Sequence, residues 1–596
     1  MEGAWGVLHF FLWFYVLYFL LKADPPAKKT IFWAFIIVAT LIGLQEIYEG
    51  VILKTYRPFA TLGNPTYIGF LSLLLIFLNF YFIRLLTGDK ITKFFLLLLL
   101  PLFLAALIIS GTRGSMIGLL AGLLAIAFYL LLTSEKSVKL KIIILGTIVL
   151  AVIGFYLFLK TEAALRLPGT DRLATIFQLK LAQTPRWLSW GIFLDGFKAK
   201  PLFGYGLENS PLVFYKHFNP EIFKYEEVIF DRPHNKFLEA LVTQGVIGLL
   251  VWLIFLFTAF AALSVVADRY LKAALVGFLV AYVAQSLTLF DMQVSYLVFF
   301  FGLSLLTGPA LPAAIKKQPN HSYFNLAVFK TNFSYIVPLL LLVVGLYFNF
   351  HHLFIVRAVI SNLAQPPKNA IDNYFTLAET AGPFLQEEAI ILKNYIESHR
   401  DKIDTLEQVE KITAVFKKAY QKDPGDIRVI NIYSSHLATV LNIKKSNGLD
   451  YSSEQQESEK IFTQAAAAYP RFSDIYINYS TFLATVGKRN EALKLLDDKK
   501  DLLTVSARLT FILASMFDNF GEINKAVGVL QSAKANGVLP SNTPMALFAL
   551  KVYLKAQQPQ EAKLIIEHIL KIDNNPDTVK AINQAVTEFG YPQLQL

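Results

Sequence analysis

The segment Asp231-Arg-Pro-His-Asn-Lys-Phe-Leu-Glu-Ala-Leu-Val-Thr-Gln-Gly-Val-Ile-Gly-Leu-Leu-Val-Trp, residues 231–252, joins a polar stretch to a membrane-length apolar run. Pro233 disfavours helix at Arg232 but is compatible with the start of the helix that follows. His234 and Asn235 are therefore expected at the N-terminal end of a transmembrane helix. Open amide groups and the helix dipole favour an anionic ligand there and keep the imidazole neutral, as a general base requires.

The apolar residues of the 596-residue chain are concentrated before about residue 351. With 55% hydrophobic residues and a mean hydropathy of +0.48, the chain has the composition of a polytopic helical membrane protein. Residues 352–596 are mixed and polar, which is typical of a soluble domain. We therefore predict an all-α protein with a membrane domain at 1–351 and a soluble helical domain at 352–596.

A membrane-spanning helix needs about 20 apolar residues. We predict about ten spans, at residues 5–21, 31–51, 64–86, 94–110, 113–132, 141–159, 237–264, 271–290, 293–308 and 334–351. Basic residues are concentrated in alternate loops, which places those loops in the cytoplasm. The large loop at about 160–236 and the C-terminal domain then face outward.

The whole net charge of +11 lies in residues 1–351, because residues 352–596 carry equal numbers of acidic and basic side chains. This favours cytosolic anchoring loops and an anionic substrate, and it argues against binding of nucleic acid. The chain has no cysteine, which excludes disulfides and thiol chemistry.

Three arginines are expected on the outward side of the membrane. Arg113 lies in the polar break Ser110-Gly-Thr-Arg-Gly-Ser between two apolar runs. Because an arginine at membrane depth costs roughly 2.5–3.5 kcal/mol, it usually has a partner or a function, although snorkelling to the headgroups is the alternative. Arg57 and Arg186 share this side, and guanidinium groups bind phosphate in a bidentate manner.

The stretch that begins at Arg186 has helical spacing and predicts an amphipathic helix at the membrane interface. Gly204 and Gly206 follow in Pro201-Leu-Phe-Gly-Tyr-Gly and permit a tight turn that approaches a ligand, or a plain interfacial turn. Residues 1–351 contain no Asp-x-Asp, His-Glu-x-x-His, Walker or Gly-x-Ser-x-Gly motif. We therefore expect neither a metal nor a cofactor.

Together these segments resemble the O-antigen ligase superfamily, which includes lipopolysaccharide O-antigen ligases, polysaccharide polymerases and protein O-oligosaccharyltransferases. Four segments match in order: Arg57 to Gly63-Asn-Pro, Gly111-Thr-Arg113-Gly-Ser, Arg186 with Trp190 leading to Pro201-Leu-Phe-Gly-Tyr-Gly, and His234-Asn-Lys-Phe-Leu-Glu239 running to Gly245-Val-Ile-Gly248. The resemblance covers about residues 30–308. Family members carry a serine where this chain has Thr112, and they usually carry about three more spans before the one that begins at Trp5. Missing earlier spans are one explanation of the outward start of this sequence.

The resemblance implies transfer of a glycan from an undecaprenyl-diphosphate carrier to an acceptor hydroxyl at the outer face of the bacterial inner membrane. His234 would take the proton of the acceptor, whereas Arg113 and Arg186 would bind the diphosphate and stabilise the leaving group. The candidate residues for binding the lipid-linked glycan are Arg57, Arg113, Arg186, Asn235, Gly204, Gly206 and Glu239. The acceptor is a lipid, a growing polysaccharide or a protein, and the sequence does not distinguish these.

The C-terminal domain contains helical hairpins at a regular spacing. Gly487-Lys-Arg-Asn-Glu-Ala492, Gly521-Glu-Ile-Asn-Lys-Ala526 and Gln557-Gln-Pro-Gln-Glu-Ala562 are similar, and the first two are offset by 34 residues (521 minus 487). This period resembles tetratricopeptide repeats and predicts an α-solenoid that offers a surface to a protein partner. Two other functions stay open: a flippase or transporter of lipid-linked sugars, and a noncatalytic scaffold that recruits partners through the repeats.

Overall fold

The structure is a computed structural model that describes residues 4–23, 27–86, 90–166, 171, 172, 174, 185–307, 354, 355, 357–379, 385–403 and 405–596. Their regular secondary structure is helical, with no strand among them, which confirms the predicted all-α fold. They form two compact units. The first, the membrane unit, contains the described residues up to His217 and from Ile229 to Thr307, and the second, the repeat unit, contains Phe218–Val228 and the residues from Phe354 onward.

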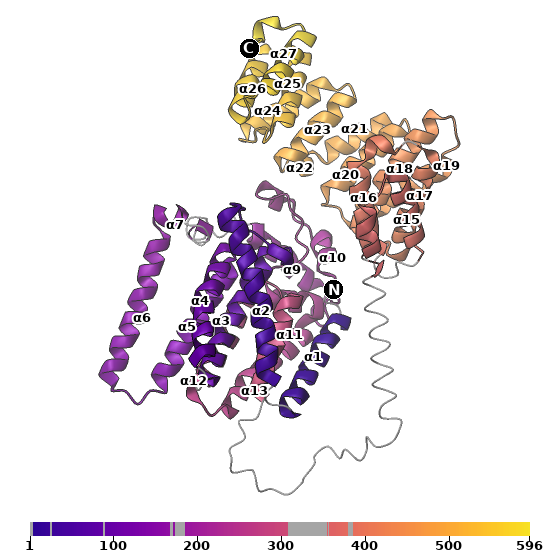
Figure 1. The fold of residues 1–596 in the computed structure, drawn as a ribbon. Coiled ribbons are helices and arrows are strands. Elements are labelled where there is room, and N and C mark those ends of the chain that lie inside the picture. The colour runs from indigo at the N-terminus through magenta and orange to yellow at the C-terminus, as the bar shows by residue number, and fades with distance from the viewer. Residues whose placement is uncertain are drawn as a thin grey trace, which may run out of the picture. The chain divides into compact units, whose positions relative to one another are not determined.

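Most helices of the membrane unit form a bundle, and α6 (Val138–Leu159) stands apart from it (Figure 1). The helices of this unit are α1 (Ala4–Ala23), α2 (Ala27–Ile47), α3 (Pro65–Leu85), α4 (Lys90–Ile109), α5 (Arg113–Leu132), α6, α7 (Glu162–Arg166), α9 (Pro185–Ala199), α10 (Ser210–Lys216), α11 (Lys236–Ala262), α12 (Arg269–Ser286) and α13 (Gln293–Thr307), with a π-helical turn at Tyr48–Ile52 and 3-10 turns at Ala60–Leu62 and Leu263–Val265.

Six helical segments in the described residues are long and apolar enough to cross a membrane, so the protein is a multi-pass membrane protein. They are Lys29–Ile52, Pro65–Leu85, Lys90–Ile109, Arg113–Leu132, Val138–Leu159 and Lys236–Val265, and the shorter apolar segments Leu8–Leu21 and Gln293–Leu306 match the first and ninth predicted spans. The eighth predicted span corresponds to α12, and the tenth, at 334–351, lies outside the described residues. The total of ten spans stays a prediction.

Helix α3 lies at the centre of this bundle and packs against α2, α4, α5, α12 and α13. Its sequence is apolar on all sides, as expected of a helix that is surrounded by others. The ring of Phe82 on α3 stacks on Phe32 of α2 with 3.7 Å between centroids. Asn64 starts the helix by accepting a hydrogen bond from the amide of Thr66 at 2.9 Å.

A row of glycines lets α5 and α12 approach closely. Gly114, Gly118 and Gly122 occur every four residues on α5, and Gly277 lies opposite on α12. A Cβ atom on Gly122 would lie 2.7 Å from the carbonyl oxygen of Gly277, and one on Gly118 would lie 2.9 Å from the carbonyl oxygen of Ala281. Small residues at this spacing allow backbone contact between membrane helices. This glycine seam fixes α5, which begins at Arg113, against α12.

Helix α11 contains a break at Gly245, where φ is 69° and ψ is −171°. The segment Pro201–Gly206 hydrogen-bonds to the broken region: Tyr205 N–H donates to the carbonyl of Val242 at 3.0 Å, and Val246 N–H donates to the carbonyl of Pro201 at 2.9 Å. Backbone groups released by the break are thereby satisfied, as a membrane environment requires.

The repeat unit consists of helices that pack in consecutive pairs, such as α20 with α21, α23 with α24 and α25 with α26. Its helices are α15 (Pro367–Leu377), α16 (Leu385–Ser398), α17 (Leu406–Lys422), α18 (Ile427–Ser446), α19 (Ser452–Ala468), α20 (Ser473–Thr485), α21 (Arg489–Asp498), α22 (Lys500–Leu503), α23 (Ala507–Asn519), α24 (Ile523–Ala535), α25 (Thr543–Lys555), α26 (Pro559–Ile572) and α27 (Pro576–Glu588), with 3-10 turns at Pro220–Lys224, Arg400–Lys402 and Pro592–Leu594.

The repeated turns seen in the sequence end helices in the same way. Gly487 and Gly521 have φ of 86° and 73°, and Gln557 takes the same place with a φ of 56°. The amide of the residue after each of them donates a hydrogen bond to a carbonyl in the preceding helix. For example, Glu522 N–H donates to the carbonyl of Phe517 at 2.8 Å. This is the Schellman ending, which favours glycine at the left-handed position. The assignment to tetratricopeptide repeats stays a prediction.

Part of the predicted external loop packs with the repeat unit. Phe218 is buried and contacts the ring of Phe472 edge to face, with 5.6 Å between centroids. Arg508 binds Glu227 at 2.5 Å and Asp474 at 3.4 Å. Residues Phe218–Val228 therefore join the C-terminal helices, although the sequence places them in the membrane domain.

The glycine seam predicts a sharp difference between two glycine-to-alanine changes. Gly122→Ala should lower the free energy of unfolding by about 1–3 kcal/mol, because the new methyl group would overlap the ring of Phe77 and the backbone of α12. Gly146→Ala on α6 is the control, since its Cβ meets nothing within 4 Å. Thermal unfolding in detergent measures both, and equal melting temperatures would contradict close packing at the seam.

In the repeat unit, Gly521→Ala should lower the stability of α23 and α24 by about 1–2 kcal/mol because alanine disfavours positive φ. Gly528→Ala, inside α24, should raise the stability of these helices by about 0.5–1 kcal/mol. A Cβ meets nothing within 4 Å at either position, so only the backbone conformation differs. Hydrogen exchange of the two helices in the full chain tests this, and changes of the same sign would refute the Schellman assignment.

Candidate functional site

Arginine side chains gather around the loop that precedes α5 in the membrane unit. Arg57 donates from Nε to the carbonyl of Ser110 at 3.2 Å, and Arg172 donates from a terminal guanidinium nitrogen to the carbonyl of Gly111 at 3.3 Å. Both therefore hold the loop directly before Arg113, the first residue of α5. Arg113 interacts electrostatically with Arg172.

Arg186 connects this group with the histidine segment. It is the second residue of α9, and its guanidinium donates to the carbonyl of Thr288 at 3.4 Å. It interacts electrostatically with both Arg113 and His234. Thr288 also lies against the start of α5, since a Cβ on Gly114 would lie 2.2 Å from its hydroxyl oxygen. The structure thus brings together Arg113, Arg186 and His234, which are far apart in the sequence.

The arginine cluster, defined as Arg57, Arg113, Arg172 and Arg186, has the electrostatic character of an anion site. Burial, followed by the charge of Arg172, lowers the pKa of Arg57. A guanidinium nevertheless stays protonated in a protein, so the positive charges repel one another. Asp171 is the acidic side chain that interacts with Arg113. A bound anion with several oxygens would relieve this repulsion through paired hydrogen bonds.

His234 has a defined tautomer and a confined ring. Its Nδ1 lies 2.9 Å from the carbonyl oxygen of Arg232. Because a carbonyl can only accept, Nδ1 carries the hydrogen and Nε2 has the lone pair in the neutral form. Phe230 and Phe290 contact the ring edge to face, with 5.7 and 5.1 Å between centroids.

The surroundings of His234 favour its neutral form. Burial lowers the pKa of His234 most, the hydrogen bond to the Arg232 carbonyl opposes this effect, and the charge of Arg186 lowers the pKa further. The neutral imidazole is the form that accepts a proton.

Two contributors to this geometry were not found from the sequence. Arg172 lies in the external loop outside any motif, and only proximity in the fold reveals it. Trp190 lies in the predicted amphipathic helix, which is α9, and its indole N–H donates to the carbonyl of Pro233 at 2.7 Å. It therefore positions the residue directly before His234.

The start of α11 uses its own amide groups. Asn235 is the N-cap, and its Oδ1 accepts from the amides of Phe237 and Leu238 at 3.0 and 3.1 Å. The amide of Glu239 donates to the carbonyl of Asn235 at 2.8 Å. The sequence suggested that these amide groups bind an anion, but they are hydrogen-bonded within the chain. The guanidinium groups of the arginine cluster are therefore the better candidates for binding diphosphate.

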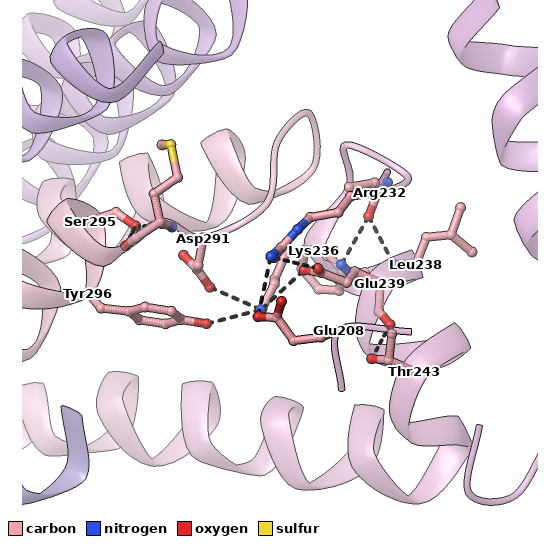
Figure 2. Close-up of polar contacts among 12 residues, drawn as sticks. Glu208, Arg232, Lys236, Leu238, Glu239, Thr243, Asp291, Ser295 and Tyr296 are labelled. Atoms are coloured by element: carbon pink, nitrogen blue, oxygen red, sulfur yellow. Dashed lines mark hydrogen bonds and ion pairs between the residues drawn. The ribbon is translucent and has the colours of Figure 1, made fainter. Parts of the chain in front are cut away.

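The other sequence-predicted binding residues have structural contacts. Gly204 approaches the backbone of α11, since a Cβ there would lie 2.5 Å from the carbonyl oxygen of Val242. Gly206 N–H donates to the carbonyl of Thr243 at 2.7 Å. Glu239 is buried and forms ion pairs with neighbouring cations (Figure 2). Ligand binding by these residues stays a prediction.

Unusual backbone conformations mark the same region. Arg57, Glu208 and His234 have φ of 52°, 68° and 53°, which non-glycine residues rarely adopt. Conformations of this kind are found preferentially at functional sites. Within the described residues, no group of three or more His, Asp or Glu side chains is arranged to hold a metal ion.

Comparison with known proteins supports a family for this region. Residues 94–253 match the family model described as O-antigen ligase. The match supports the O-antigen ligase superfamily for this part of the chain. No curated protein matches the chain.

The O-antigen ligase domain contains most of the site. Its matched residues include Arg113, Arg186 and His234, whereas Arg57 lies before them. A function of the glycan ligase or polymerase type, carried out by a membrane glycosyltransferase-like enzyme, follows from this family.

The electrostatics predict the titration of His234. Its reactivity toward diethyl pyrocarbonate, which acylates neutral imidazole, should be half-maximal below the ordinary value of about 6.5. Arg186→Gln removes a positive charge and should raise the pKa of His234. As the pH falls, the variant should therefore lose reactivity at a higher pH than the wild type does. Arg84→Gln, whose partner is Asp268, is the control. Mass spectrometry of the His234 peptide measures this, and an unchanged midpoint in Arg186→Gln would disprove the coupling.

Proposed function

We propose that this protein transfers a glycan from an undecaprenyl-diphosphate-linked donor to an acceptor hydroxyl at the outer face of the bacterial inner membrane. The position of Arg186, which interacts with both Arg113 and His234, is the observation that supports this proposal most. Arg186 thereby connects the neutral base His234 with the arginine cluster, and a reaction with a diphosphate leaving group requires both a base and an anion site. The outward orientation rests on the distribution of basic residues in the loops.

In the proposed reaction, the acceptor oxygen forms a bond to the anomeric carbon of the donor sugar. Nε2 of His234 takes the hydroxyl proton, because Nδ1 already carries a hydrogen that it donates to Arg232. The bond between the anomeric carbon and the diphosphate oxygen breaks, and the electron pair leaves with the diphosphate. Arg113 and Arg186 bind the diphosphate and stabilise its increasing negative charge. Arg57 and Arg172 hold the loop before Arg113 and add positive charge.

The acceptor hydroxyl belongs to a lipid, a growing polysaccharide or a protein. The repeat unit favours a protein partner, since paired helices of this kind offer extended surfaces for protein binding. Mass spectrometry of glycans in the lipid and protein fractions, with and without this gene, identifies the acceptor.

His234→Ala should reduce transfer about 100- to 10,000-fold, the usual contribution of a positioned general base. Binding of the lipid-linked glycan should be retained, because the arginines are unchanged. Transfer is measured with purified full-length protein and lipid-linked glycan.

His217→Ala is the matched control, since burial also lowers the pKa of this histidine, which pairs with Tyr205 at 3.2 Å. Transfer at the wild-type level in His234→Ala would remove His234 as the base. Movement of the lipid across proteoliposomes without a new glycosidic bond would indicate a flippase instead.

A further inference from the structure

A narrow cavity of about 240 Å³ lies along one face of α11. Its lining on this helix extends from Lys236 to Phe255, on both sides of the break at Gly245. Its walls toward the middle of α11 are aromatic, with Trp252 and Phe255 facing Phe10 of α1 and Phe300 of α13.

The polar end of this α11 cavity is a network of ion pairs (Figure 2). Arg232 binds Glu239 at 3.0 Å and Glu208 at 3.5 Å. Lys236 binds the other oxygen of Glu239 at 3.3 Å and donates to the hydroxyl of Tyr296 at 3.1 Å. The cavity therefore has a charged end at the start of the helix and an apolar interior farther along it.

The charges that line the polar end cancel. Arg232 and Lys236 contribute two positive charges, and Glu208 and Glu239 contribute two negative charges. Asp291 pairs with Lys236 at 3.6 Å from behind and does not line the cavity. This balance contrasts with the arginine cluster, where an anion is favoured. A ligand with both charge signs and no net charge fits the polar end best.

The α11 cavity opens toward the surface of a membrane-spanning helix. Val251 and Phe11 both line it, and they are 61% and 41% exposed. Because α11 is one of the helices long and apolar enough to cross a membrane, we expect exposed apolar side chains on it to meet lipid. The occupant can therefore enter sideways from the membrane.

We infer that the α11 cavity binds a zwitterionic phospholipid, with one hydrocarbon chain along α11 and the head group at Glu208, Arg232, Lys236 and Glu239. The phosphate lies toward the two cations and the ammonium group toward the carboxylates. The aromatic walls hold the chain by dispersion contacts and exclude water. This site is separate from the arginine cluster and does not depend on the proposed glycan transfer.

The experiment uses the purified full chain, delipidated in detergent and mixed with equal amounts of dioleoyl phosphatidylethanolamine and dioleoyl phosphatidylglycerol. Native mass spectrometry counts the lipids that stay bound. The wild type should retain phosphatidylethanolamine about fivefold better, the effect of about one unit charge near a membrane surface. Glu208→Gln should reverse this preference, because it leaves the polar end with one net positive charge.

Val251→Trp should block the opening and abolish retention of phosphatidylethanolamine. Ile254→Trp is the matched control, because Ile254 lies on the same helix, is also 61% exposed and does not line the cavity. Equal retention of the two lipids by the wild type, or equal retention by the two tryptophan variants, would overturn the proposal. Displacement of phosphatidylethanolamine by undecaprenyl phosphate would also overturn it, since the cavity would then belong to an isoprenoid lipid.

Discussion

The close contact between α5 and α12 is the constraint on which the candidate site depends. Glycines every four residues on α5 leave no side chain between the two backbones, so the helices cannot slide or rotate without collision. This contact holds Gly114 against Thr288, whose carbonyl binds Arg186. The position of Arg113 relative to Arg186 is thus set by helix packing, together with the hydrogen bonds of Arg57 and Arg172 to the loop before Arg113.

The membrane unit contains two polar regions with different electrostatics. In the arginine cluster, positive charges accumulate with Asp171 nearby, and the resulting field attracts anions. At the start of α11, equal numbers of acidic and basic side chains pair with one another. His234 lies next to both regions, since Arg186 acts on its charge and Arg232 binds its Nδ1. The imidazole therefore has a fixed tautomer, and burial favours its neutral form.

Much of the fold could be predicted from the sequence because membrane helices are defined by length and apolar composition. The predicted spans at 64–86, 113–132 and 141–159 differ from α3, α5 and α6 by only a few residues at each end. The 34-residue period likewise predicted the paired helices of the repeat unit. The break at Gly245 was not predicted, because a single glycine in an apolar run is compatible with a continuous helix.

For the candidate site, the sequence predicted Arg113, Arg186 and His234, which carry motif patterns or stand out at membrane depth. It did not predict Arg172, Trp190 or the pairing of Glu239 with Lys236, because these depend on which segments the fold brings together. The sequence also suggested that backbone amides at the start of α11 have no hydrogen-bond partner and are available to an anion. The side chain of Asn235 occupies two of them, and only the cap geometry shows this.

The break in α11 also has a consequence for how the protein is made. Pro201–Gly206 supplies the hydrogen bonds that the helix lacks around Gly245, and this segment precedes α11 in the chain. During synthesis it leaves the ribosome first, so its backbone is already available when α11 enters the lipid phase.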